Sequence, residues 1–351
     1  MIRQNKKVLV AISGGVDSST AAAILLENGF DCAGVFMITS DNNRRLQADA
    51  EDVAKKLGIE LAVLDLCSDF ESILDYFCSE YIKGRTPNPC VLCNRYIKFG
   101  KLWRFAKDTG ADFLATGHYA RVLNHASHIG LYESVDPAKD QSYVLSMIDK
   151  DVLQYIMLPI GNYSKKQTRL MAAKFGLGTE NRKESQEICF VPNDDYTALL
   201  EKRHPELVRP GNIIDAAGKS LGCHNGIHRF TIGQRRGLHV AMGKPYYVAR
   251  IDADSNNIVL APQEQVMHRR LWAAQVNWLV DKPKSPFQAK VKIRYNDKGS
   301  AATIYPDGDS VIVEFDQPKL AITPGQLAVF YVLEQDTYRV FGGGWIDKAA
   351  D

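Results

Sequence analysis

The sequence has no long apolar run and no strong excess of charge of either sign. Its longest purely aliphatic stretch, residues 21–26, is far shorter than the roughly 20 residues needed to cross a bilayer, so we expect no membrane partner. The first seven residues are polar and lead directly into a strand pattern, which predicts no secretory signal and a cytoplasmic protein. With 43 Lys and Arg against 41 Asp and Glu, the net charge of +2 neither indicates nor excludes a nucleic-acid binder.

Cysteine is also scarce, with seven residues in a chain of 351. An odd number of cysteines without a secretory signal argues against a secreted disulfide scaffold. We therefore interpret them as buried apolar residues, catalytic thiols or metal ligands. Heptads, repeats and low-complexity tracts are lacking, and 45% apolar with 24% charged residues is typical of a globular protein of two or three domains.

The first half of the sequence alternates strand-type and helix-type patterns. Strands are predicted at residues 7–13, 31–37, 60–64 and 111–116, and helices at 18–28, 46–57, 70–83 and 96–109. Such alternation predicts a parallel sheet with helices on both faces. Further on, Ser164 and Gln167 form a capping-box signal for a helix that extends to Phe175.

Beyond about residue 200, glycines separate short segments. Alternating strands are then expected from Leu271 onward, at residues 289–295, 301–305, 310–315, 326–331 and 338–345. The predicted plan is an α/β domain over 1–198, a small glycine-rich domain over 199–263 and an antiparallel β-barrel over 264–351. Residues 226–238 of the small domain carry His228, Arg229, Arg235 and Arg236 among glycines, a composition that suits contact with a phosphate backbone.

The string SGGVDSS at residues 13–19 follows the first strand and opens the first helix. Gly14 and Gly15 allow a sharp turn that brings backbone N–H groups close to an anion, and the helix N-terminus adds unpaired N–H groups. Ser13 and Ser18 can add hydroxyl donors, and Asp17 can hold a Mg²⁺ ion that bridges phosphate oxygens. The string G-x-x-x-x-G-K-[ST] is absent. The loop resembles that of the ATP pyrophosphatase superfamily, whose members cleave ATP between the α and β phosphates.

Three cysteines stand in unusual surroundings. Cys90 and Cys93 lie in GRTPNPCVLCN, and Cys189 lies in ESQEICFV. Two prolines forbid a regular helix until about Cys93, so we expect Cys93 at a helix N-terminus with a lowered thiol pKa, helped by Lys98 and Arg95. By itself the C-x-x-C pair leaves half of a zinc site, a redox motif and a structural pair open, although a second pair of zinc ligands is missing.

Seven motifs occur in a fixed order over nearly the whole chain: SGGVDSS, GRTPNPCVLCN, ATGHYAR, KDQSYVL, SQEICFV, GIHRFTIGQRRGL and TPGQ. Together they resemble the tRNA-specific 2-thiouridylase family. The resemblance implies an enzyme that uses ATP to replace the C2 oxygen of the wobble uridine, U34, with sulfur in tRNAs for glutamate, glutamine and lysine. It also implies AMP and pyrophosphate as products, a persulfide-bearing donor protein and a reductant.

The resemblance further assigns residues to roles. Cys93 matches the nucleophilic cysteine and Cys189 the cysteine that carries a persulfide. The ATP-contacting positions are Ala11, Ile12, Ser13, Gly14, Gly15, Val16, Asp17, Ser18, Met37 and Gly117. Asn88, Pro89 and Cys90 match the stretch that meets the target base, and the other tRNA-contacting positions are His118, Lys139, Asp140, Gln141, Arg294, Tyr295 and Gln326.

One departure from the family pattern leaves two mechanisms open. Many members have aspartate where this chain has Cys90, and Cys90, Cys93 and Cys189 together can hold a [4Fe–4S] cluster that presents sulfide. The alternative is a persulfide relay between Cys189 and Cys93. Two other classes remain for comparison. A small-molecule amidoligase would need a glutaminase domain that does not fit here, and a non-catalytic RNA-binding protein would not need the intact phosphate loop.

Overall fold

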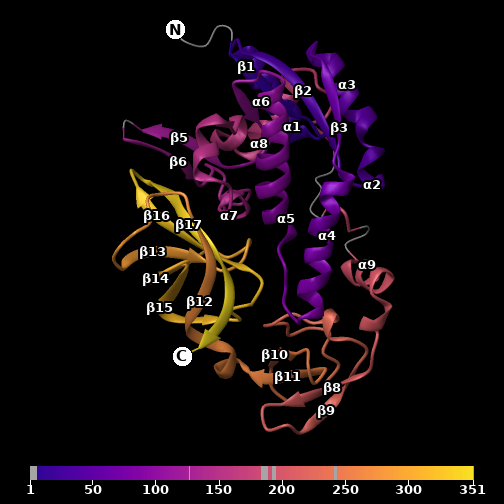
Figure 1. Ribbon diagram of the computed structural model, residues 1–351, viewed down its shortest axis with the longest axis vertical. Coiled ribbons are helices and arrows are strands. Elements are labelled where there is room, and N and C mark those ends of the chain that lie inside the picture. Colours follow the sequence, from indigo (N-terminus) through magenta and orange to yellow (C-terminus); the bar gives the residue numbers. More distant parts are fainter. Residues whose placement is uncertain (1–5, 126, 183–188, 192–194, 241–242, 351) are drawn as a thin grey trace. The chain divides into compact units, whose positions relative to one another are not determined.

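The computed structural model describes residues 6–125, 127–182, 189–191, 195–240 and 243–350. The chain forms two compact units (Figure 1). The first comprises Met1–Ser72, Cys90–Phe190 and Leu333–Phe341, and the second Ile73–Pro89, Val191–Val332 and Gly342–Asp351.

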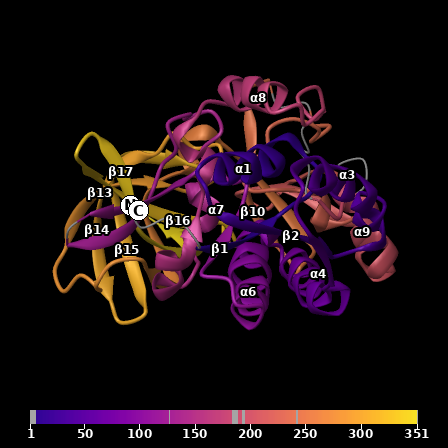
Figure 2. The same cartoon turned by 90° about the horizontal axis from the view of Figure 1, so that it is seen from above.

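The first unit contains a five-stranded parallel sheet, as predicted. Its strand order is β3 (Leu61–Asp65), β2 (Asp31–Ile38), β1 (Lys7–Ala11), β4 (Phe113–Ala115) and β7 (Ile156–Met157). Helices α1 (Val16–Glu27) and α8 (Lys165–Lys174) cover one side of the sheet, and α6 (Trp103–Asp108) covers the other (Figure 2). The apolar run in β1 is central to this core, because Val8 and Val10 are fully buried among side chains of β2 and α1.

The capping-box prediction is also confirmed. Ser164 caps α8, its hydroxyl accepting from the Gln167 backbone N–H while the Gln167 side chain accepts from the Ser164 N–H. The helix α3 (Gln47–Leu57) ends at Gly58, which has the left-handed conformation that is common at helix C-termini. The sequence analysis made no prediction for the hairpin of β5 (Arg121–His125) and β6 (His128–Tyr132), which belongs to the same unit.

The helix that carries the C-x-x-C pair begins earlier than predicted. It starts as α5 (Pro89–Leu92), continues as the π-helix η1 (Cys93–Leu102) and ends as α6. The expectation of an irregular chain up to Cys93 is therefore wrong. Proline is tolerated in the first turn of a helix, where its missing N–H would have no partner, so Pro89 opens the helix instead of breaking it.

The second unit contains two β structures. One is a four-stranded sheet of β10 (Tyr246–Asp252), β11 (Asn257–Pro262), β8 (Gly211–Asp215) and β9 (Ser220–His224). The other is an antiparallel barrel of β12 (Met267–Trp278), β15 (Ser310–Leu320), β14 (Ser300–Asp307), β13 (Phe287–Lys292), β16 (Leu327–Glu334) and β17 (Thr337–Ala350). Pairing of β12 with β17 closes the barrel, which confirms the predicted architecture.

The remaining helical elements are short apart from α4. They are α2 (Asp41–Arg44), α4 (Cys67–Ile82), α7 (Ser142–Leu145), α9 (Tyr196–Arg203), η2 (Lys150–Tyr155), η3 (Pro159–Asn162), η5 (Pro205–Leu207), η6 (Ile227–Arg229) and η7 (Gln263–Val266). Among the described residues, no helix combines the length and the apolar character needed to span a membrane.

Candidate nucleotide and thiol site

The phosphate loop lies between β1 and α1, where the carboxyl end of a parallel strand meets a helix N-terminus. Gly15 is the N-cap residue of α1, and no side chain caps the helix. Gly14 has a φ of +78°, and a Cβ there would lie 2.6 Å from the Asp49 Cβ, so the turn requires glycine. The Ser18 hydroxyl folds back to accept from the Ser13 N–H at 3.1 Å. The first turn of α1 therefore offers backbone N–H groups to an anion.

A buried lysine that the sequence analysis missed adjoins this loop. Lys165, the first residue of α8, places its Nζ 2.8 Å from both carboxylate oxygens of Asp17. The Tyr119 hydroxyl donates to Asp17 Oδ1 at 2.8 Å, and the Lys165 ammonium lies 5.6 Å from the centre of the Tyr119 ring. The one available sequence signal was the capping box, which fixed Lys165 as the start of a helix without indicating what it faces.

Arg182 is a second missed cation at the loop. Its guanidinium donates to the Gly14 carbonyl oxygen and forms an ion pair of 2.9 Å with Asp49. Nearby, the buried hydroxyls of Ser19 and Thr179 lie 3.0 Å apart. Residues from 165 to 182 thus bring two cations to a loop whose own sequence contains none.

Other predicted ATP-contacting residues surround the same loop. Gly117 follows β4, and a Cβ on it would lie 2.6 Å from the backbone nitrogen of Ser18, so only glycine permits this close packing. Ala11 is paired with Val35 of β2, and the next residue, Ile12, donates to the Val35 carbonyl oxygen. Met37 is half-buried on β2. The structure therefore brings Gly117 against the loop and places Met37 on the adjacent strand.

The three thiols of interest all lie in the first unit, and all seven cysteines are free. Although Cys90 and Cys189 reach solvent, surrounding protein atoms disfavour their thiolates and raise both pKa values. The pKa of Cys189 rises to about 12, first through this desolvation and then through the charges of Cys93 and Cys90, while Lys98 opposes the rise. These charge interactions indicate that the thiols of Cys90, Cys93 and Cys189 lie near one another.

The predicted lowering of the Cys93 pKa is wrong. Desolvation raises the pKa of Cys93, with Lys98 acting in the opposite direction. Two physical reasons account for the error. Cys93 lies one turn inside the helix that Pro89 opens, so it lacks the unpaired N–H groups of a helix N-terminus, and it is surrounded by protein.

Lys98 is held by the predicted tRNA-contacting residue His118. The Lys98 Nζ lies 3.3 Å from His118 Nε2, and the Thr116 hydroxyl lies 2.7 Å from Nδ1. Burial and the Lys98 charge keep the pKa of His118 well below its ordinary value, so the ring is neutral. His118 is buried and both of its nitrogens are engaged. Its contact with tRNA stays a prediction.

Residues 139–141 are tied to the same unit by internal hydrogen bonds. Asp140 is buried and accepts from the Ser134 N–H and from both the N–H and the hydroxyl of Ser142. Gln141 accepts from the backbone N–H of Tyr119 at 2.9 Å, and the hydroxyl of the same tyrosine donates to Asp17. Lys139 is half-buried. In this structure Asp140 and Gln141 shape the chain around Tyr119.

In the second unit, the side chains of two predicted tRNA-contacting residues donate hydrogen bonds to backbone carbonyl oxygens. Gln326 donates to the carbonyl oxygens of Thr86 at 2.9 Å and Pro87 at 3.2 Å, directly before Asn88 and Pro89. Arg294 donates to the carbonyl oxygens of Ile232 and Ala321 and to the Thr323 hydroxyl. Tyr295 is 40% exposed. Of Gln326, Arg294 and Tyr295, only Tyr295 is exposed, whereas the other two are half-buried.

Metal ligands were predicted at Asp17 and at Cys90, Cys93 and Cys189. Within the described ranges, no three side chains of His, Cys, Asp or Glu are arranged to hold a metal ion. Asp17 directs both oxygens to Lys165, and the three thiols do not form a ligand set.

A parallel sheet with an uncapped phosphate loop after its first strand, followed by two β structures, defines a nucleotide-binding protein of the HUP class. Residues 6–193 match the family model described as the tRNA methyl transferase HUP domain. Residues 198–262 match the tRNA methyl transferase PRC-barrel domain, and residues 268–346 the aminomethyltransferase beta-barrel domain.

More narrowly, the chain belongs to the tRNA-specific 2-thiouridylase family. It is 45% identical to the tRNA-specific 2-thiouridylase MnmA of Carboxydothermus hydrogenoformans, with 98% of each chain covered. Identity to the MnmA of Syntrophotalea carbinolica is 44%, covering 99% of this chain and 100% of that protein. The family resemblance seen in the sequence is confirmed.

A more remote likeness exists among solved structures. The U34-tRNA thiolase NcsA from Methanococcus maripaludis, solved with its [4Fe–4S] cluster, is 20% identical, with a TM-score of 0.36 over 58% of this chain and 68% of that chain. A likeness this remote assigns no ligand to the present protein.

Proposed function

We propose that the protein is a cytoplasmic tRNA-uridine 2-sulfurtransferase. It uses ATP to adenylate the C2 oxygen of U34 in tRNAs for glutamate, glutamine and lysine, and then replaces that oxygen with sulfur, releasing AMP and pyrophosphate. The observation that carries the proposal is that one compact unit holds both an uncapped phosphate loop and the thiols of Cys93 and Cys189. The names of full-length relatives support the same reaction.

Adenylation addresses the central chemical difficulty, because the C2–O bond of uridine has a poor leaving group. Uridine O2 attacks the α-phosphate of ATP, pyrophosphate leaves, and AMP becomes the leaving group at C2. Negative charge develops on the phosphates during this step. The N–H groups of the first turn of α1 and the cations Lys165 and Arg182 are placed to stabilise that charge. Asp17 and Tyr119 orient Lys165.

Magnesium normally accompanies ATP and would neutralise phosphate charge. The donor set at Asp17 does not fit it, because both carboxylate oxygens already accept from the Lys165 ammonium and one also accepts from Tyr119. No step of the proposal therefore runs through a magnesium ion at Asp17.

Sulfur transfer uses the two thiols in turn. A donor protein passes a sulfane sulfur to Cys189, which becomes a persulfide. The terminal sulfur attacks C2, and AMP leaves with the former C2 oxygen. The Cys93 thiolate then attacks the Cys189 sulfur, so that 2-thiouridine departs and a Cys93–Cys189 disulfide forms. A reductant supplies two electrons and two protons to restore both thiols.

The cluster alternative would need Cys90, Cys93 and Cys189 as iron ligands. Cys90, Cys93 and Cys189 lie in one region, but they form no metal-ligand group among the residues that the structure describes. The proposal accordingly contains no step through a [4Fe–4S] cluster.

For the tRNA we propose contacts from all three predicted domains, 1–198, 199–263 and 264–351. Asn88, Pro89 and Cys90 face the target base, Lys139 and Tyr295 touch the tRNA, and His118, Asp140, Gln141, Arg294 and Gln326 act by fixing the segments around them. Support for this division comes from the internal hydrogen bonds of the latter five residues.

The test is a reconstituted reaction with an unmodified glutamate tRNA transcript, ATP, a persulfide donor and a thiol reductant. We expect tRNA-dependent AMP and 2-thiouridine in equal amounts. The Cys189→Ser variant should still form AMP but no 2-thiouridine, because oxygen carries no transferable sulfane sulfur. Thiolation by Cys189→Ser, or wild-type AMP formation that is independent of tRNA, would refute the proposal.

A further inference from the structure

A cavity of about 450 Å³ lies in the second unit, and none of its lining residues is a proposed reacting group. It is lined by Arg235, Gly237, Leu238, His239, Val240, Lys244, Pro245 and Tyr246. Its volume lies within the roughly 300–1,000 Å³ that is usual for small-ligand sites. Its lining contains two permanent cations and no acidic side chain.

The cations of the cavity are free to meet an anion. Arg235 and Lys244 are exposed, and so is the adjacent Arg236. Within the described part of the chain, no carboxylate lies at ion-pair distance from any of these three side chains. Lys244 Nζ lies 5.8 Å from the centre of the Tyr246 ring, so a cation and an aromatic face stand side by side in the lining.

The loop that carries Arg235 is fixed at its start. The Gly233 N–H donates to the Val248 carbonyl oxygen at 2.8 Å, and the Val248 N–H donates to the Gln234 carbonyl oxygen at 2.9 Å. These two bonds join the loop to strand β10. A cation on a fixed loop loses less conformational entropy on binding an anion than one on a free loop.

Arg294 holds the same loop from the barrel side. Its Nη2 donates to the Ile232 carbonyl oxygen, one residue before Gly233, and to the Ala321 carbonyl oxygen. A Cβ on Gly233 would lie 2.2 Å from the Ala321 Cβ and 3.2 Å from Arg294 Nη2, so the loop packs closely against both. Arg294 therefore fixes the backbone of the loop that carries Arg235 into the cavity lining.

We propose that this cavity is a binding site for a backbone phosphate of the substrate tRNA, in which Arg235 and Lys244 contact the phosphate and Tyr246 packs against the adjoining nucleotide. Arg294 is a positioning residue for this site. The inference rests on the proposed function in taking tRNA as the substrate, but it concerns RNA binding and not the chemistry at the thiols. Guanidinium and ammonium groups suit phosphate oxygens, and a tyrosine face suits a base or ribose.

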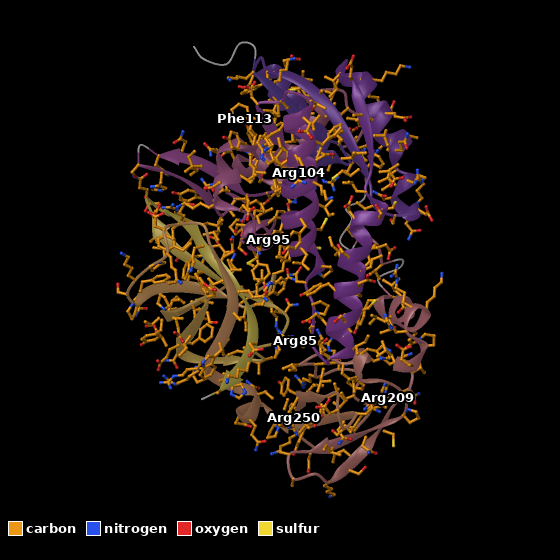
Figure 3. The ribbon with its side chains drawn as sticks, viewed as in Figure 1. Arg85, Arg95, Arg104, Phe113, Arg209 and Arg250 are labelled. Atoms are coloured by element: carbon orange, nitrogen blue, oxygen red, sulfur yellow. The ribbon has the colours of Figure 1, made fainter. Side chains whose placement is uncertain are left out.

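The test measures the affinity of the full-length protein for an unmodified glutamate tRNA transcript at several salt concentrations. Arg235→Ala/Lys244→Ala should weaken binding at least tenfold near physiological salt. It should also make the slope of log affinity against log salt shallower by about 1, because fewer counterions are released. The matched control is Lys219→Ala/Arg250→Ala, which removes two exposed cations of the same small domain outside the cavity (Arg250 is labelled in Figure 3).

A charge-retaining pair, Arg235→Lys/Lys244→Arg, shows whether a loss reflects charge or misfolding, and we expect it to keep most of the wild-type affinity. Arg294→Ala should weaken tRNA binding, and adding it to Arg235→Ala/Lys244→Ala should cause little further loss, since both act at one site. Full additivity would overturn the positioning role. An equal loss in the control pair would overturn the site, because net charge alone would then explain the effect.

Inorganic phosphate tests whether the cavity binds a free phosphate ion instead of a phosphate of the tRNA backbone. If millimolar phosphate protects the wild-type protein, but not Arg235→Ala/Lys244→Ala, against thermal unfolding, and the two proteins bind tRNA with the same affinity, the cavity binds free anions and the proposal is overturned. Cavity-dependent tRNA binding in a protein that forms no 2-thiouridine would leave the inference standing while the proposed reaction failed.

Discussion

Lys165 Nζ lies 2.8 Å from both carboxylate oxygens of Asp17, although 148 residues separate the two in the chain. Asp17 belongs to the phosphate loop, and Lys165 opens a helix packed on the same side of the sheet. The lysine is buried, so its charge is poorly solvated and depends on this partner. The ion pair with Asp17 therefore holds a cation beside the loop that an anion would enter.

Replacing Lys165 should therefore lower the rate of adenylation and have little effect on tRNA binding. We expect Lys165→Ala to lower tRNA-dependent pyrophosphate release at least about 100-fold, the effect typical of removing one preorganised charge-stabilising donor. Lys166→Ala is the matched control, because Lys166 is its exposed neighbour on α8. If Lys165→Ala releases pyrophosphate at the control rate, Lys165 serves only the fold.

The phosphate loop could be predicted from sequence because its parts are contiguous. A buried strand, two glycines and a helix start within residues 7–19 specify both the turn and the anion-binding amides. Lys165 and Arg182 were missed for the opposite reason. They reach the loop only through the packing of later segments against α1, and a single sequence gives no signal for such long-range pairs.

Predictions from local sequence also failed where the position of a residue within its element differed from the expected one. Pro89 was taken to delay the helix, but in its first turn proline is compatible with helical geometry, and this moved Cys93 away from the helix N-terminus. Similarly, the sequence placed Arg294 in a predicted barrel strand, residues 289–295, as a tRNA-contacting residue. In the structure its guanidinium donates to the carbonyl oxygen of Ile232, 62 residues earlier, and to that of Ala321, 27 residues later, and only the packing of the second unit creates these contacts.

The raised pKa of Cys189 predicts slow alkylation at neutral pH. With a pKa of about 12, nearly all of this residue is thiol at pH 7, and only the thiolate reacts. The iodoacetamide rate at Cys189 should rise about tenfold per pH unit from pH 7 to 9, without a plateau. Because the Lys98 cation lowers this pKa, Lys98→Ala should raise it and slow alkylation several-fold at each pH.

Site-resolved mass spectrometry measures this rate for Cys189 separately from the other thiols. Lys101→Ala is the control, because the Lys101 ammonium pairs with Asp69 at 2.9 Å and does not contribute to the raised pKa of Cys189. A plateau near neutral pH, or equal rates in Lys98→Ala and wild type, would contradict the electrostatic account of the thiol region.

Gln326 should act through the segment that leads to the C-x-x-C pair. Gln326→Ala removes donors to the Thr86 and Pro87 carbonyl oxygens and should lower the free energy of unfolding by about 1–2 kcal/mol. Gln326→Glu should cost more, because a carboxylate would then face two carbonyl oxygens. Both changes appear in urea unfolding without tRNA. A direct RNA contact predicts instead that Gln326→Ala weakens tRNA binding and leaves unfolding unchanged.

Cys90→Asp separates the two routes of sulfur transfer. The proposed relay uses only the thiols of Cys93 and Cys189, so it does not require a thiol at position 90. Cys90 reaches solvent, so a side chain of similar size fits there without unfolding the helix that begins at Pro89. We therefore expect the variant to keep at least about half of the wild-type yield of 2-thiouridine.

The decisive measurement is bound iron together with 2-thiouridine yield, for wild type and Cys90→Asp purified and reconstituted without oxygen. A cluster that needs three thiolates would lose iron and activity together in the variant, and that result would count against the relay. Activity in both proteins without stoichiometric iron is the outcome we expect. The proposed relay needs only the thiols of Cys93 and Cys189, and the charge interactions of Cys189 with Cys93 and Cys90 indicate that the three thiols lie near one another.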